Sequence, residues 1–227
     1  MDHLALTTDH SNQAADTGSA VHRAAAAYHT NGKDIAAAIA TMQHFGKEYP
    51  QADLQDAAAQ FLGYCQDTRN AEAVFAQAQK RPAVELRHQM EIDGVFIQGT
   101  LDQIRVQGGR MYVWDLKSSK KPGLEILHNH IYQVAAYSVL ASDFLQEEVH
   151  PGGIIRTRAY TEKRNGDAGV FFSYVIDASQ ARSMINQVVK FVHTIREGGA
   201  HAVPGEYCWH CPARSVDICL PKLLELK

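Results

Sequence analysis

The stretch 99–119, GTLDQIRVQGGRMYVWDLKSS, constrains the fold of this chain more than any other segment. Apolar and polar residues alternate along both of its halves, and the Gly108-Gly109 pair between them is a turn signal. The pattern predicts a β-hairpin. A period of two places Asp115 and Lys117 on one face of the second strand, and the hairpin returns Asp102 beside Asp115. The sequence therefore predicts an acidic pocket with one cation at its rim.

Helical patterns precede the hairpin, and mixed patterns follow it. Alanine-rich helices are predicted at 19–30, 34–45, 52–64 and 70–79, and Pro82 ends this layer. Residues 84–116 then predict three antiparallel strands, with turns at Asp93-Gly94 and at the glycine pair. A helix at 124–145, strands at 153–160 and 170–176, and a helix at 179–197 complete the pattern. This order predicts an α/β fold in which a mixed β-sheet is flanked by helices and preceded by an N-terminal helical layer.

The length of 227 residues suits one mixed domain with a helical extension. We expect a loosely held, flexible tail at 1–16 and a single domain at 17–227. Within the domain we expect the helical layer at 17–80, an α/β core at 81–200, and a C-terminal segment with cysteines at 201–227.

Charge and hydropathy narrow the possible classes of function. The formal net charge of -3 argues against a general nucleic-acid-binding protein, so any nucleic-acid role must come from a local site. No apolar run approaches the roughly 20 residues of a membrane span, and the N-terminus lacks the basic and apolar regions of a signal peptide. We therefore expect a cytoplasmic protein that does not cross a membrane.

The carboxylates of the hairpin offer hard oxygen ligands, which favour Mg²⁺ or Mn²⁺. Asp102, Asp115 and the backbone carbonyl of Leu116 could supply part of such a site. A divalent ion lowers the pKa of its bound water and neutralises charge on a phosphoryl oxygen, so phosphodiester hydrolysis is the reaction that this set favours. Lys117 would orient the attacking water or stabilise the pentavalent transition state.

The residues 84–122, followed by YQVAAY at 132–137, resemble the PD-(D/E)XK nucleases. The resemblance is to the RecB-like exonuclease branch, which includes CRISPR-associated and phage-encoded members. In that branch an upstream helix carries G-x-x-x-H, a G-x-x-D strand precedes a D-x-K strand, and a Q-x-x-x-Y helix follows. The matching residues are Gly18, His22, Gly99, Asp102, Asp115, Lys117, Gln133 and Tyr137.

The resemblance implies a restriction-endonuclease-like core and a deoxyribonuclease that depends on Mg²⁺ or Mn²⁺. Its members imply an exonuclease that acts on single-stranded DNA or duplex ends in recombination, repair or phage DNA processing. His22 would complete the metal ligands, and Gln133 and Tyr137 would brace Lys117 or touch the DNA backbone. Glu85 begins a strand where many members have an acid, which implies a supporting role behind the ligands.

A plainer interpretation of each motif stays open. A D-x-K triplet occurs by chance on solvated strands, and His22 could be an ordinary surface or core histidine. Gln133 and Tyr137, at i and i+4 of a helix, could be packing and capping contacts, and Glu85 could be a solvated strand end. The alternative function is a nuclease fold without turnover that binds DNA or protein. An active site that had lost its activity, however, would not require both aspartates and the lysine.

Basic residues cluster in the sequence after the hairpin and in the later strand region. These are Lys120, Lys121, Arg156, Arg158, Lys163 and Arg164. They could contact the phosphates of DNA, although charge runs more often form solvated surface. No base-reading motif is visible, so sequence-specific recognition is not expected.

The four cysteines are unevenly distributed, because Cys208, Cys211 and Cys219 lie close together while Cys65 is far away. Such clustering favours metal binding over disulfides in a cytoplasmic protein. Several RecB-like nucleases end in a similar trio that, with one earlier cysteine, holds a 4Fe-4S cluster. Here the last gap is longer than usual, and Cys65 follows His22 instead of preceding it. A Zn²⁺ site, an unligated set of thiols, or an interaction protein built around these cysteines are the other possibilities.

Overall fold

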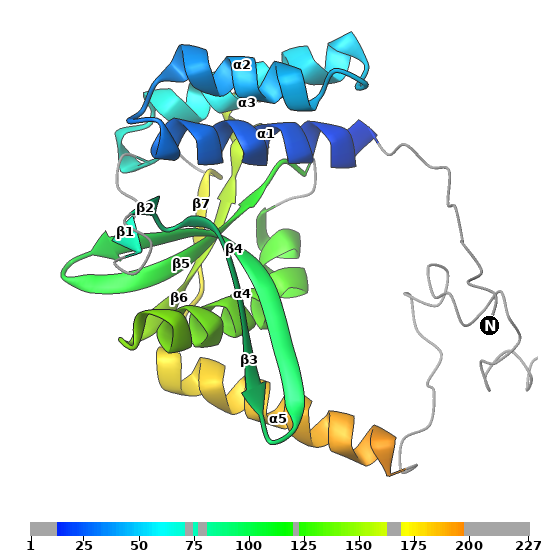
Figure 1. The fold of residues 1–227 in the computed structure, drawn as a ribbon, viewed down its shortest axis with the longest axis vertical. Coiled ribbons are helices and arrows are strands. Elements are labelled where there is room, and N and C mark those ends of the chain that lie inside the picture. Colours follow the sequence, from blue (N-terminus) through cyan, green and yellow to red (C-terminus); the bar gives the residue numbers. More distant parts are fainter. Residues whose placement is uncertain (1–12, 71–74, 77–80, 120–122, 163–168, 198–227) are drawn as a thin grey trace, which may run out of the picture. The chain divides into compact units, whose positions relative to one another are not determined.

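The computed structural model describes residues 13–70, 75–76, 81–119, 123–162 and 169–197 (Figure 1). The chain divides into two compact units, Met1–Ile185 and Asn186–Lys227. The first unit contains all the helices and strands up to the first part of the last helix, α5 (Ala178–Arg196). The expected domain boundaries, 17–227, stay a prediction, because residues 198–227 lie outside the described part of the chain.

The N-terminal layer consists of α1 (Gln13–Thr30), α2 (Ile35–Phe45) and α3 (Gln51–Gln66). Asp34 caps α2 by accepting a hydrogen bond from the Ala37 N–H at 3.0 Å, as its position before an alanine-rich run predicts. Helix α1 already begins within the segment that the sequence predicts to be a tail.

The main sheet has the order β3-β4-β5-β6-β7 and is mixed, which confirms the predicted fold class. Its strands are β3 (Val84–Ile92), β4 (Val95–Gln107), β5 (Arg110–Lys117), β6 (Val149–Arg156) and β7 (Phe171–Ser173). Among the pairings of the described strands, β5–β6 is the only parallel one. A parallel pairing needs a long crossover, and α4 (Gly123–Leu145) provides it.

The segment 70–79 is predicted to be a fourth helix, and residues 71–74 and 77–79 of it lie outside the described residues. Its described part, Asn70 and Phe75–Ala76, is not α-helical. The structure has a short 3-10 helix η1 (Thr68–Asn70) and a two-stranded ladder of β1 (Phe75–Ala76) and β2 (Arg81–Pro82). The predicted helix of ten residues would have little stability by itself in water. Pairing between β1 and β2 is therefore the more stable arrangement of Phe75–Ala76. The predicted strand 153–160 is also displaced: β6 begins at Val149, and residues 157–160 form the 3-10 helix η3 (Thr157–Tyr160).

Figure 1 shows α1–α3 on one face of the sheet and α4 on the other. Among the described residues, one apolar core lies under α1–α3, a second lies between the sheet and α4, and a third joins α4 to α5. Trp114 and Leu116 of β5 join the core under the helical layer, whereas Val113 joins the core that includes α4. The period of two along β5 therefore has a physical basis, because both faces of this strand are buried. Within the described part of the chain, no helix has both the length and the apolar composition that a membrane span requires.

Candidate active site

The β4–β5 hairpin forms as the alternation predicts. The register pairs Gln103 with Trp114, so Asp102 and Asp115 come next to each other at the following position. The Leu116 N–H donates a hydrogen bond to Asp102 Oδ2 at 2.6 Å. Both aspartates are buried, with exposed fractions of 8% and 1%. The hairpin thus places two carboxylates within the protein at the point where β5 ends.

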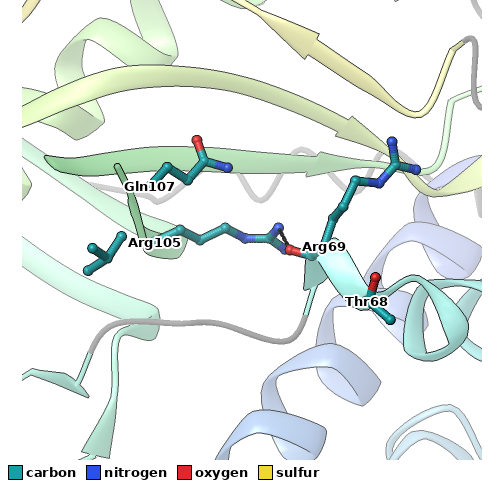
Figure 2. Close-up of a pocket in the computed structure, with 5 residues that line it drawn as sticks. Thr68, Arg69, Arg105 and Gln107 are labelled. Atoms are coloured by element: carbon teal, nitrogen blue, oxygen red, sulfur yellow. Dashed lines mark hydrogen bonds between the residues drawn. The ribbon is translucent and has the colours of Figure 1, made fainter. Parts of the chain in front are cut away.

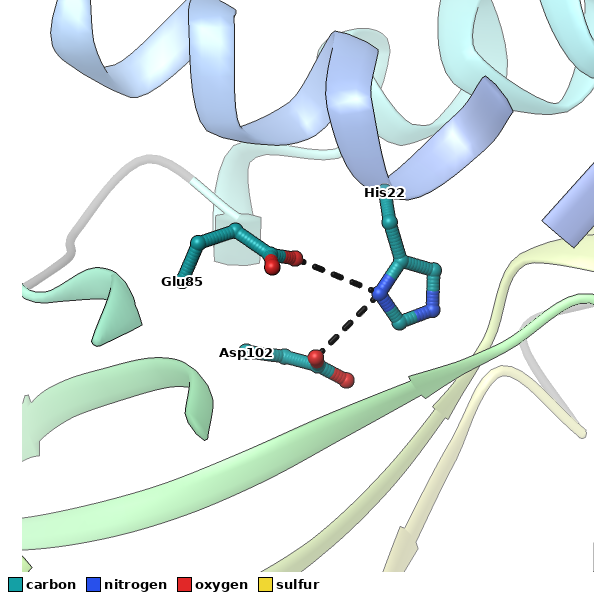
Figure 3. A group of neighbouring side chains, drawn as sticks. All are labelled: His22, Glu85 and Asp102. Atoms are coloured by element: carbon teal, nitrogen blue, oxygen red, sulfur yellow. Dashed lines mark hydrogen bonds and ion pairs between the residues drawn. The ribbon is translucent and has the colours of Figure 1, made fainter. Parts of the chain in front are cut away.

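Helix α1 brings His22 beside the carboxylates of Asp102 and Glu85 (Figure 3). His22 Nδ1 lies 3.2 Å from Asp102 Oδ1 and 3.3 Å from Glu85 Oε1, and its Nε2 lies 3.0 Å from the Leu116 carbonyl oxygen. One ligand atom from each of His22, Glu85 and Asp102 lies within 4.8 Å of the others. Gly18, one turn earlier, allows α1 to approach, because a Cβ there would lie 2.9 Å from Ser118 Oγ.

Glu85 occupies an unusual backbone position opposite Asp102. Its neighbours Val84 and Leu86 pair with Gln103 and Leu101, and Glu85 between them has a φ of 47°. A left-handed conformation costs a non-glycine residue roughly 1–2 kcal/mol, and such strain concentrates at functional sites. The sequence predicts a supporting role behind the ligands, but the structure places this carboxylate among the candidate ligands.

The charges of this cluster depend strongly on one another. Burial alone would lower the pKa of His22, but Asp102 and Glu85 outweigh it and hold the pKa well above 6.5. Burial alone would raise the pKa of Asp102, but His22 and the Leu116 N–H keep it below its usual value. Burial and the nearby Asp102 raise the pKa of Asp115 to about 7, although Lys117 acts in the opposite direction. The positive charges of His22 beside Asp102 and of Lys117 beside Asp115 therefore stabilise the ionised carboxylates.

On the α4 side of the sheet, the lysine of the hairpin meets the predicted Gln-Tyr pair. Lys117 Nζ lies 2.9 Å from Asp115 Oδ2 and 3.4 Å from Gln133 Oε1. Gln133 Nε2 donates to Asp115 Oδ1 at 3.2 Å and to the Tyr137 hydroxyl at 2.8 Å. A Cβ on Gly99 would lie 2.9 Å from Tyr137 Cε1, so this glycine leaves room for the tyrosine ring.

Asp115 Oδ2 is the atom that most clearly suggests a cation site. It is buried, and the Lys117 ammonium lies 2.9 Å from it, but among the described residues it receives no well-directed hydrogen bond. A buried carboxylate oxygen normally receives such a bond. The oxygens of Asp102, Asp115 and the Leu116 carbonyl, with an imidazole nitrogen of His22, are a donor set that fits Mg²⁺ or Mn²⁺.

One residue of this network is absent from the sequence prediction. His130 Nδ1 lies 2.8 Å from Gln133 Oε1, on the side of the amide that also faces Lys117. The signal was present in the spacing, because positions 130, 133 and 137 follow i, i+3 and i+7 on one helix face.

The predicted DNA-binding residues are only partly described. Lys120, Lys121, Lys163 and Arg164 lie outside the described residues. Arg156 is buried and pairs with Glu162, at 2.7 Å from Nη1 to Oε2. Arg158 Nη1 lies 2.6 Å from Asp56 Oδ1. Both guanidinium groups thus contact carboxylates of the protein, and their contact with DNA stays a prediction.

The predicted cysteine site is also only partly described. Cys208, Cys211 and Cys219 lie outside the described residues. Cys65 is partly buried and packs against the core beneath the helical layer, and burial raises the pKa of its thiol to about 12. This thiol therefore stays protonated unless a metal ion or a cluster binds it.

A separate hollow of about 290 Å³ is lined by Thr68, Arg69, Arg105, Val106 and Gln107 (Figure 2). Arg105 is 1% exposed and donates to the Arg69 carbonyl at 2.7 Å and to Asn70 Oδ1 at 2.8 Å. Arg69 pairs with Asp67. None of the residues that line this hollow belongs to the group of His22, Glu85 and Asp102. Arg105 of β4 and Arg69 of η1 join these two elements at the hollow.

Comparisons with known proteins agree with the geometry. The model of the PD-(D/E)XK nuclease superfamily matches residues 2–219. The chain therefore belongs to the PD-(D/E)XK nuclease superfamily, which confirms the resemblance inferred from the motifs.

A crystal structure of a "Putative exonuclease" from Eubacterium rectale is similar over 92% of this chain and 76% of that chain, with a TM-score of 0.50 and 14% identity. At this identity the similarity shows the fold alone. No curated protein matches the sequence.

Proposed function

We propose that the protein is a divalent-metal-dependent deoxyribonuclease of the RecB-like branch, and that it acts as an exonuclease. The observation that carries the proposal is the convergence of His22, Asp102 and Asp115 beside Lys117. The buried carboxylates of Asp102 and Asp115 supply the hard oxygen ligands that a divalent cation prefers. The ordered motifs and the superfamily membership support hydrolysis of a phosphodiester bond.

His22, Asp102, Asp115 and the Leu116 carbonyl would hold Mg²⁺ or Mn²⁺, with Glu85 as a further carboxylate of the site. When bound, the ion supplies charge neutralisation at the phosphoryl oxygen and a more acidic water. The protein supplies the positions of these donors.

Lys117 is the residue that would act on the reacting groups. Its ammonium lies 2.9 Å from Asp115 Oδ2 and carries three donors on one nitrogen. It would orient the attacking water or stabilise negative charge on the phosphate. Gln133 and Tyr137 would keep Lys117 and Asp115 in place through their hydrogen bonds.

DNA as the substrate and an exonuclease mode rest on similarity. The description of the Eubacterium rectale protein as an exonuclease agrees with the RecB-like motifs. DNA ends or single strands would need no base-reading motif. Recombination, repair or phage DNA processing are the roles that the motifs favour. Catalytic inactivity with DNA or protein binding is the alternative, and the intact Asp102, Asp115 and Lys117 argue against it.

An iron–sulfur cluster at Cys65, Cys208, Cys211 and Cys219 is a separate proposal, with Zn²⁺ as the less favoured occupant. Its support is the sequence spacing alone. A brown protein that contains iron and sulfide would support the cluster, whereas a colourless protein that contains zinc or neither metal would contradict it.

The nuclease proposal is tested with end-labelled single-stranded DNA, the matching duplex and an RNA of the same sequence. We expect cleavage of DNA with Mn²⁺ or Mg²⁺ and none with a chelator. Asp115→Asn and Lys117→Ala should each lower the rate about a hundredfold or more, because each removes a charge from the site.

Asp143→Asn is the matched control for this test. Asp143 is a carboxylate of α4 that lies 2.8 Å from His88 Nε2, outside the cluster, so its replacement should leave the rate unchanged. Equal activity in wild type, Asp115→Asn and Lys117→Ala, or no cleavage by the wild type with either ion, would contradict the proposal. Preference for the RNA would contradict DNA as the substrate. The length of the labelled products gives the polarity and the exonuclease or endonuclease mode.

A further inference from the structure

The side-chain amide of Gln133 is at the centre of the hydrogen bonds around Lys117. Its nitrogen donates to Asp115 Oδ1 and to the Tyr137 hydroxyl, and its oxygen faces Lys117 Nζ and His130 Nδ1. An amide has two donors and one acceptor oxygen with two lone pairs, so both of its ends are fully used here.

The polarity of this amide follows from its neighbours. Ionised Asp115 only accepts hydrogen bonds, and the Lys117 ammonium only donates them, so the nitrogen end must face Asp115. His130 Nδ1 must then carry a proton and donate it to Gln133 Oε1. The His130 ring therefore has a defined role in the network whether the ring is neutral or charged.

The distances show how the oxygen of Gln133 is shared. His130 Nδ1 lies 2.8 Å away, within the ordinary range for a hydrogen bond, whereas Lys117 Nζ lies 3.4 Å away. His130 is thus the principal donor to this oxygen. Lys117 keeps only a weak contact with it and lies closer to Asp115, at 2.9 Å from Oδ2.

We infer that His130 is a positioning residue that acts through Gln133 on the Lys117–Asp115 pair, an inference that rests on the proposed nuclease function. His130 saturates the oxygen of Gln133 and fixes the amide plane. Lys117 then stays paired with Asp115, at 2.9 Å from Oδ2, and its other ammonium donors are left for the substrate. Without His130, Lys117 is the remaining partner of the Gln133 oxygen, and its ammonium shifts toward the amide.

The variant His130→Ala should lower kcat about tenfold, because one hydrogen bond to the amide is lost, and should leave the KM for DNA unchanged. His130→Asn should restore the rate, because the asparagine amide nitrogen occupies the place of Nδ1 and donates in the same direction. His128→Ala is the matched control, because His128 is an exposed histidine on the same helix. It should behave as the wild type.

The route through Gln133 is tested by the double variant. Placed in a Gln133→Ala background, His130→Ala should lower kcat no further, because the residue through which it acts is gone. An equal loss in both backgrounds would overturn the inference and would indicate a direct contact with DNA or a general effect on folding. A rise in KM with kcat unchanged would overturn it as well.

The positioning can also be measured without activity, from the side-chain amide signals of Gln133 in the nuclear magnetic resonance spectrum. The Gln133→Ala spectrum assigns these signals. In His130→Ala their protons should exchange with water about tenfold faster, and in His130→Asn they should return to the wild-type rate. Unchanged exchange would overturn the inference. If the wild type cleaves no DNA while exchange responds as expected, the proposed function fails and the positioning stands.

Discussion

At the scale of single residues, His22 supplies the positive charge that the buried carboxylates need. Its two ring nitrogens face carboxylate and carbonyl oxygens, namely those of Asp102, Glu85 and Leu116. A protonated ring donates from both nitrogens and satisfies these acceptors together. A metal ion at the same oxygens would take over this charge, and His22 would have to lose a proton to become a ligand.

A second histidine of α1 makes a prediction about stability. His29 is 6% exposed, and its Nε2 lies 2.7 Å from the Tyr64 hydroxyl. Burial, with Arg105 nearby, lowers the pKa of His29 from 6.5 to about 4. Between pH 4 and pH 6.5, therefore, the imidazole of His29 is protonated in the unfolded chain but neutral in the folded protein. The free energy of unfolding should fall as the pH drops from 6.5 to 4, by up to about 3 kcal/mol, and the contribution should stay constant outside this window.

Denaturant unfolding of wild type and His29→Gln across this pH range measures the effect. Glutamine can still bond to Tyr64 but does not titrate, so the difference between the two proteins should change with pH. The control is His44→Gln, at an exposed histidine of α2. Parallel pH profiles for wild type and His29→Gln would show that His29 does not couple folding to protons.

At the scale of elements, the hairpin and the helix after it were predictable, and the local irregularities were not. Alternation alone placed Asp115 and Lys117 on the face that meets Gln133. Periodicity could not predict the strained φ of Glu85, because a positive φ at a non-glycine residue leaves no mark in the pattern of apolar and polar side chains. It also could not show that Arg105 is buried, since a charged residue in an alternating strand normally predicts an exposed face.

The glycine of the G-x-x-D strand gives a prediction that joins two elements. In Gly99→Ala the new Cβ would lie 2.9 Å from Tyr137 Cε1, so the ring of Tyr137 must move. Overpacking of this kind costs about 1–3 kcal/mol of stability, and it should also lower the cleavage rate because Tyr137 holds Gln133.

Thermal unfolding and the cleavage assay check this prediction. Thr100→Ala, at the neighbouring exposed position of β4, is the control and should be close to wild type in both. Wild-type stability and activity in Gly99→Ala would show that the two motifs do not depend on each other.

At the scale of the whole first unit, the candidate site is assembled from segments that lie far apart in the sequence. His22 comes from α1, Glu85 from β3, Asp102 from β4 and Asp115 from β5. The Tyr64 hydroxyl contacts His29, Gln103 and Arg105, and so joins the helical layer to β4 beside Asp102. The sequence predicts that Asp102, Asp115 and Lys117 lie near His22 and the Gln133–Tyr137 pair, but it does not predict His130. It also does not predict the buried network around Tyr64, because its members carry no periodic signal.

Calorimetric titration with Mn²⁺ shows whether His22, Asp102 and Asp115 form one divalent-metal centre beside Lys117. The wild type should bind Mn²⁺, and Asp115→Asn should bind it at least about tenfold more weakly. Lys117→Ala should bind it as tightly as the wild type or more tightly, because a positive charge near the ion is removed. If Asp115→Asn binds Mn²⁺ as tightly as the wild type, or if the wild type binds none, this metal centre does not exist as described.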